Sequence, residues 1–174
     1  MNELYPLPAL DPALAGGIGG ASFRDTQTAE EAGLRYEPKI DFMHKILRGE
    51  LSAVSAYESV LAKYPGSPYV SELQVVLAHH KSSVDALREL LDAQGEIADA
   101  DSGAWGTFVQ TLMTGSNSIS FELSLKTLLE GEEHGLKQYQ QLLEFPLTEH
   151  ELDVIETSLV PRQYAHIQSL KRLI

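Results

Sequence analysis

Two glutamates and two histidines stand at positions from which an α-helix would turn them into a protein core. They are Glu50, His80, Glu132 and His166. Each lies in a run of apolar residues that recur every three or four positions, which is the spacing of one face of a helix. Burying an isolated carboxylate costs several kcal/mol unless it is paired, protonated or bound to a metal. These four side chains therefore predict a polar site inside a helical core.

Two kinds of chemistry fit these residue types. Carboxylate and imidazole together form a ligand set suited to iron, manganese or zinc, which favours a metal site made of the four side chains. Alternatively, the two carboxylates pair with two imidazolium groups and form a neutral buried network. Both interpretations bury the same residues, so the sequence leaves them open.

The chain contains one helical pattern twice. Residues 46–61 match residues 128–143 at an offset of 82, which aligns the two glutamates with each other. Residues 80–91 match residues 163–174 at an offset of 83. A helix pair that is repeated once predicts a four-helix bundle made of two similar halves. The expected fold class is therefore all-α, an antiparallel four-helix bundle.

Turn and capping signals place the helices. Three are expected over residues 38–64, 68–94 and 118–145, and a fourth follows from residue 148 onward. Thr148 and Glu151 have the spacing of a capping box, which marks the start of this fourth helix. Pro161 should kink it, because proline lacks the backbone N–H that a helix interior uses. The kink would lie beside Gln163.

Two segments fall outside the helical pattern. The stretch from residue 95 to residue 118 would form a long crossover between the second and third helices, with a short helix at 104–113. Residues 1–36 are interrupted by prolines and glycine pairs, which is typical of an extended or disordered arm that contacts the bundle or a neighbouring subunit. The expected domain organisation is this arm followed by a bundle over residues 37–174.

The composition narrows the possible functions. Asp and Glu outnumber Lys and Arg by 25 to 13 among 174 residues, which gives a net charge of −12. Such a charge repels phosphate backbones and anionic membranes, so neither nucleic acid nor membrane is an expected partner. The absence of cysteine excludes disulfides and thiolate ligands. No apolar run reaches the length of a membrane span and no signal peptide is evident, so we expect a cytoplasmic protein.

The pattern Glu50-x-x-Ala53-x-x-x-Tyr57 resembles the first helix of ferritin-like and bacterioferritin-like proteins. Those proteins bind two iron ions with one Glu from each of two helices and a Glu-x-x-His pair from each of the other two. The resemblance implies a ferritin-like bundle in which Glu50 and Glu132 match the single glutamates. His166 matches the final histidine.

Three positions depart from the family pattern. His80 stands where the family has Glu, Ser83 where it has His, and Gln163 where it has Glu. The resemblance therefore implies a degenerate di-iron centre, with Ser83 and Gln163 at the altered ligand positions. A neutral amide binds metal weakly, so Gln163 is expected to be a hydrogen-bonded filler.

A closer resemblance is to the bacterial ferritin-like domains of unknown function that are linked to stress. It rests on three segments, Asp101-Ser-Gly-Ala-Trp-Gly, Gly131-Glu-Glu-His-Gly-Leu-Lys-Gln-Tyr139 and His166-Ile-Gln-Ser-Leu-Lys. Membership of that family implies a ferritin-like fold over about residues 38–174. It also implies a metal site that many members have lost in part.

Four further polar side chains adjoin the candidate site. His79 and His134 each neighbour a core position, but they point about a hundred degrees away around the helix. We expect both to be partly exposed and outside the site. Tyr57 and Tyr139, which the repeat aligns, are expected to be core residues with hydrogen-bonded hydroxyl groups.

Two functional hypotheses follow. The first is a non-enzymatic ferritin-like protein with a degenerate metal centre, which acts in stress physiology as a homodimer or other homo-oligomer or through an unknown protein partner, with no cofactor. The alternative is a metal-dependent oxidoreductase or iron-handling protein that holds iron or manganese in a reduced site. The ligands of that site would be Glu50, His80, Glu132 and His166.

Overall fold

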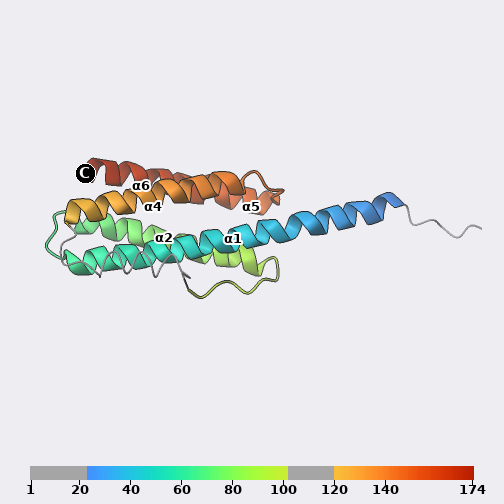
Figure 1. The fold of residues 1–174 in the computed structure, drawn as a ribbon, viewed down its shortest axis with the longest axis horizontal. Helices are drawn as coiled ribbons and strands as arrows, with labels where there is room; N and C mark the ends of the chain where they lie inside the picture. The colour runs from blue at the N-terminus through green and yellow to red at the C-terminus, as the bar shows by residue number, and fades with distance from the viewer. Residues whose placement is uncertain (1–22, 102–119) are drawn as a thin grey trace, which may run out of the picture. The chain divides into compact units, whose positions relative to one another are not determined.

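The structure is a computed structural model that describes residues 23–101 and 120–174, with side chains from Pro38 onward. Residues 1–22, which include most of the expected arm, and the short helix expected at 104–113 lie outside the described residues. All regular structure in the described part is helical, which confirms the all-α class (Figure 1). The elements are α1 (Phe23–Lys63), α2 (Val70–Asp92), α4 (Phe121–Leu142), α5 (Glu149–Val154), a π-helical segment η2 (Ile155–Leu159) and α6 (Val160–Leu173).

The chain divides into two compact units, Met1–Leu34 and Arg35–Ile174. All the side-chain contacts described below belong to the second unit. In the described part of the chain, no helix is both long enough and apolar enough to cross a membrane.

Helix α1 begins earlier than the sequence predicted. It starts at Phe23 and continues through Pro38, where we expected the helix to begin. The residues before Pro38 include Ala29, Glu30 and Ala32, which have high helix propensity. A proline inside a helix removes one hydrogen bond but does not prevent helical residues on both sides of it. The expected start of the first helix was therefore wrong.

The ends of α2 follow the expected turn signals. Ser67 donates its backbone N–H to the carbonyl of Tyr64 at 3.1 Å in the turn before α2. After α2, Gly95 has a φ of +79°, a conformation that costs glycine little because it lacks Cβ. The N–H groups of Gly95 and Glu96 bond the carbonyls of Asp92 and Leu91, which is a Schellman motif. This motif ends the helix where the sequence predicted.

Helix α4 begins at Phe121, and Ser120 is its N-cap residue. The Ser120 side chain accepts a hydrogen bond from the backbone N–H of Leu123, and the helix ends at Leu142. The predicted span of 118–145 is therefore correct in position, although the helix is slightly shorter at both ends.

The fourth predicted helix consists of three consecutive segments. It opens with the predicted capping box, in which Thr148 accepts from the N–H of Glu151 and the Glu151 carboxylate accepts from the N–H of Thr148. The chain then forms the π-helical segment η2, which ends two residues before Pro161. A π-helical turn, a feature frequent at functional sites, therefore lies beside the proline where we expected a kink.

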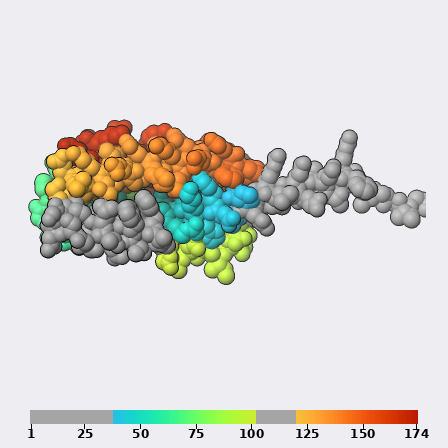
Figure 2. Space-filling view, viewed as in Figure 1, coloured from blue at the N-terminus to red at the C-terminus, as the bar shows by residue number. Residues whose placement is uncertain are grey.

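The apolar core consists of two clusters that a polar layer separates. The first cluster comprises Ile40, Met43, Ile46, Leu47, Val84, Leu87, Leu90, Leu91, Tyr139, Leu142, Ile155 and Leu159. The second comprises Ala56, Tyr57, Val60, Leu73, Val76, Leu125, Leu128 and Leu170. The polar layer is formed by Glu50 on α1, His80 on α2, Glu132 on α4, and Gln163 and His166 on α6, each of which stands along its helix between members of the two clusters. In the space-filling view the described part of α1 (cyan) lies directly against α4 (orange) (Figure 2).

A buried ion pair ties α1 to the start of α5. The Lys39 ammonium lies 2.8 Å from the Glu151 carboxylate, and both residues are at most 2% exposed. Glu151 also accepts from the Gln94 amide at 3.1 Å. Lys39 and the capping box hold the pKa of Glu151 below its usual value, although burial acts most strongly and in the opposite direction. The contacts of this carboxylate thus connect α1, the end of α2 and α5.

Candidate metal centre

The polar layer brings together side chains from all four long stretches of helix. Glu50 comes from α1, His80 from α2, Glu132 from α4, and both Gln163 and His166 from α6. Each of the five is at most 5% exposed. Their burial confirms the prediction that these residues point inward. The periodic apolar stripes set this direction.

His80 connects the two glutamates. Its Nδ1 lies 2.7 Å from Glu50 Oε2, and its Nε2 lies 2.9 Å from Glu132 Oε1. Both ring nitrogens therefore face carboxylates, which is the arrangement of an imidazolium that donates twice. Burial alone would lower the pKa of His80, but the two carboxylates outweigh it and raise the pKa to about 10. Without a metal, His80 is positively charged.

The two aligned tyrosines bond across the internal repeat. Tyr57 donates its hydroxyl to Glu132 Oε1 at 2.6 Å, and Tyr139 donates to Glu50 Oε1 at 2.7 Å. Each half of the repeat thus supplies a tyrosine to the glutamate of the other half. Burial and the nearby carboxylates raise both tyrosine pKa values well above the ordinary value of 10, so both hydroxyls stay protonated as donors. The expectation that they are hydrogen-bonded core residues is confirmed.

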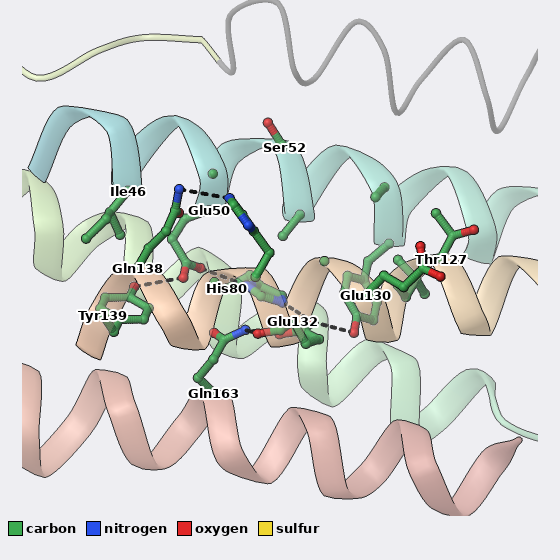
Figure 3. Close-up of a pocket in the computed structure, with 18 residues that line it drawn as sticks. Ile46, Glu50, Ser52, His80, Thr127, Glu130, Glu132, Gln138, Tyr139 and Gln163 are labelled. Carbon is green, nitrogen blue, oxygen red and sulfur yellow. Dashed lines mark hydrogen bonds and ion pairs between the residues drawn. The ribbon is translucent and has the colours of Figure 1, made fainter. Parts of the chain in front are cut away.

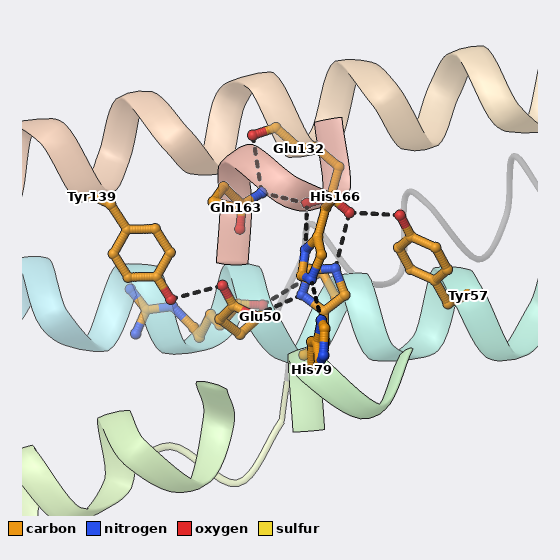
Figure 4. Close-up of polar contacts among 10 residues, drawn as sticks. Glu50, Tyr57, His79, Glu132, Tyr139, Gln163 and His166 are labelled. Carbon is orange, nitrogen blue, oxygen red and sulfur yellow. Dashed lines mark hydrogen bonds and ion pairs between the residues drawn. The ribbon is translucent and has the colours of Figure 1, made fainter. Parts of the chain in front are cut away.

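Glu132 has the largest number of partners in the network (Figure 4). Besides Tyr57 and His80, its carboxylate contacts the Gln163 amide and, at 3.3 Å, the His166 Nδ1. The same Gln163 amide donates to the backbone carbonyl of Glu132 at 3.0 Å, so Gln163 is the hydrogen-bonded residue that we expected. Burial opposes ionisation of Glu132 most strongly, but the His80 charge and the histidine hydrogen bonds hold its pKa at about 2.

His79 also joins the network, which the sequence did not predict. Its Nδ1 lies 3.2 Å from His166 Nε2, and the two rings stack with centroids 5.3 Å apart. Burial and the electrostatic effect of the neighbouring His166, Arg162 and His80 lower the pKa of His79, which favours its neutral form. The helical angle correctly predicted that His79 is partly exposed, but its ring extends over the adjacent α6.

His134, the other flanking histidine, contacts Gln138 rather than the network. Its Nε2 lies 3.1 Å from the Gln138 amide one turn further along α4. Ser83, at a position where the ferritin-like pattern would have a histidine, is buried at 3% exposure on α2. Among the described residues, Arg162 Nη1 is the buried side-chain atom that has no hydrogen-bond partner.

Three of the four predicted ligands can converge on one ion. His80, Glu132 and His166 each offer a ligand atom, and these atoms all lie within 4.8 Å of one another. Glu50 stands outside this group and contacts the opposite nitrogen of His80. A carboxylate in that position orients a metal-binding imidazole and raises its basicity. The group of two histidines and one carboxylate can hold a metal ion, and this donor set suits non-haem iron or zinc.

A cavity of about 410 Å³ reaches the network from between α1 and α4 (Figure 3). Glu50, His80 and Glu132 line it, together with Gln163. Its volume is in the range of small-molecule sites. In the described part of the chain, this cavity therefore extends to the buried cluster.

No protein-family model matches the chain, and neither a curated protein nor a solved structure matches it.

The reciprocal tyrosines lead to a ranked prediction. Removing a hydroxyl that donates to a charged group costs about 1.5–3 kcal/mol. Tyr139→Phe should cost more than Tyr57→Phe, because Glu50 keeps only His80 as a donor whereas Glu132 keeps three other partners. Urea denaturation of the metal-free protein measures both losses. Tyr164→Phe, at a side chain that is 46% exposed, serves as the control and should change stability little. A larger loss for Tyr57→Phe would contradict the assigned network.

Proposed function

We propose that the chain is an antiparallel ferritin-like four-helix bundle that binds one divalent transition-metal ion through His80, Glu132 and His166. The observation that carries this proposal is the convergence of the three ligand atoms within 4.8 Å. Glu50 would orient His80 by accepting a hydrogen bond from its Nδ1, instead of binding the metal directly as the sequence suggested.

The course of the helices supports a ferritin-like topology. Along α1 and along η2–α6 the chain passes from the first apolar cluster to the second, whereas along α2 and α4 it passes from the second to the first. Helices α2 and α4 thus run in the same direction, and a long crossover between them is required. Ferritin-like bundles have one such crossover.

The charges in the polar layer are compatible with a cation. Two carboxylates face one imidazolium, so the carboxylates are in excess, although the positive Arg162 guanidinium on α6 also acts on this region. A divalent ion would replace the proton on His80 Nε2, while Nδ1 would keep its proton against Glu50. When bound, the metal supplies Lewis-acid and one-electron chemistry. This favours a metal-dependent oxidoreductase or an iron-handling protein, with iron or manganese as the ion.

A second candidate function is the non-enzymatic one, a homo-oligomeric stress protein whose centre is a metal-free network. It is favoured by the hydrogen bonds of the two glutamates, since each of their four carboxylate oxygens has at least one partner without an ion. Such a network stabilises the bundle and requires no cofactor.

Elemental analysis separates these functions. The untagged protein is expressed with added iron and manganese and freed of loosely bound metal by gel filtration. We expect about one metal ion per chain, and a loss of at least tenfold in His166→Gln. The control His150→Gln changes an exposed histidine and should retain the metal. A folded wild-type protein with far less than one ion per chain would favour the metal-free network instead.

A further inference from the structure

The cavity between α1 and α4 exists because small residues face each other there. Gly49, Ala53 and Ala56 line it from α1, and Gly131 and Gly135 line it from α4. A Cβ atom built on Gly131 would meet nothing within 4 Å, so this part of the helix borders open space. The polar layer forms one side of the cavity, with Glu50, Tyr139 and His80 directed toward it (Figure 3).

The lining has a distinct charge. It contains three carboxylates, from Glu50, Glu130 and Glu132, against one imidazolium, that of His80, and the described lining contains no lysine or arginine. The remaining walls are mainly apolar and include Ile46 and Leu128. Such a site repels carboxylates and phosphates and favours a cation with an apolar body.

The two buried glutamates differ in the number of hydrogen-bond partners that they have. Among the described residues, Glu132 has four side-chain partners, whereas Glu50 accepts only from His80 and Tyr139. A carboxylate offers about four lone-pair directions, so Glu50 retains about two. Because Glu50 also lines the cavity, it is a buried acceptor that a ligand can reach, whereas the third lining carboxylate, Glu130, is exposed to solvent.

We propose that this cavity binds an organic cation, a protonated amine on an apolar body, with its ammonium group bonded to Glu50. The apolar body would lie along the small residues of α1 and α4. The inference does not depend on the metal, because the metal-free protein presents the same cavity. A metal ion in the neighbouring triad would weaken amine binding by repulsion, and the amine would weaken metal binding by the same factor.

Calorimetric titration of the metal-free protein with n-hexylamine, 1-hexanol and hexanoate tests this proposal. The three probes share a six-carbon chain and differ in the charge of the head group. A charge-assisted bond should make hexylamine bind about tenfold tighter than hexanol, and hexanoate should not bind. Equal binding of the amine and the alcohol, or binding of hexanoate, would overturn the proposal. Failure of the protein to bind metal would leave this result unaffected.

Three variants locate the binding site. Glu50→Gln should weaken hexylamine about tenfold while hexanol binding stays within about twofold. Gly131→Leu should weaken both probes, because its side chain enters the cavity, and it should fold well since leucine favours a helix. Glu133→Gln, on the same helix and outside the lining, should change neither. Unchanged hexylamine binding in Gly131→Leu would show that the acidic surface binds the amine instead.

Discussion

Glu132→Gln is expected to abolish metal binding and to destabilise the metal-free protein by about 3–5 kcal/mol. The substitution keeps the shape of the side chain but removes the charge that faces His80. Its amide group would also point a donor toward Gln163 and His166, which already direct their polar atoms at this carboxylate. Elemental analysis and urea denaturation measure the two effects.

Glu133→Gln is the matched control for this prediction. Glu133 is the next residue on α4, but it makes an ion pair with Lys171 at the surface, and both side chains are nearly half exposed. Exposed pairs contribute about 0–1 kcal/mol, so this variant should keep both its metal and its stability. A Glu132→Gln protein that retained one metal ion per chain would contradict the three-ligand site.

Glu50→Gln tests whether Glu50 binds the metal directly or orients the ligand His80. Glu50 contacts His80 Nδ1, so its loss should weaken metal binding by about 10–100-fold without abolishing it. Complete loss of the metal would instead support the four-ligand site that the sequence suggested. Competition with a chelator of known affinity measures the difference.

The inward direction of the site residues could be predicted from the sequence because it depends only on helical periodicity. Glu50, His80 and Glu132 each interrupt an apolar stripe, and all three are buried. The internal repeat aligned Glu50 with Glu132, and both are buried, although Glu132 has more hydrogen-bond partners and belongs to the three-residue group whereas Glu50 does not. A capping box depends only on residues that are three apart in the sequence, so the box at Thr148 and Glu151 could also be predicted, and the structure confirms it.

The contacts between helices could not be predicted in the same way. Periodicity gives the face of a residue but not the neighbour that it meets, so the crossed tyrosine bonds appear only in the structure. The same holds for His79, whose ring reaches His166 on another helix. The repeat was a usable signal for the tyrosines, since two equivalent halves that face each other can exchange donors. The start of α1 was missed because Pro38 was given more weight than the helix-forming residues before it.

The stability of the metal-free protein should depend on pH with a maximum between about pH 4.5 and 6.5. The folded pKa of His80 is about 10, above its unfolded value near 6.5. The contribution of His80 to the free energy of unfolding is therefore complete below about pH 6.5 and is lost as the pH rises toward 10. The folded pKa of Glu132 is about 2, below its unfolded value near 4.3. The contribution of Glu132 to the free energy of unfolding is complete above the unfolded pKa, near 4.3, and is lost as the pH falls through about 2.

The alkaline side gives the sharper test, because few other groups titrate there. The free energy of unfolding should fall by up to about 1.4 kcal/mol per pH unit between pH 7 and 9.5, the slope for one proton released on unfolding. His79 acts in the opposite sense, since its pKa is lowered, but its effect is confined to pH values below about 6.5. In His80→Gln the alkaline slope should disappear, and the acid slope from Glu132 should become smaller, because the His80 charge is the largest of the effects that lower the Glu132 pKa. A flat wild-type profile from pH 7 to 9.5 would mean that His80 is not the charged link between the two glutamates.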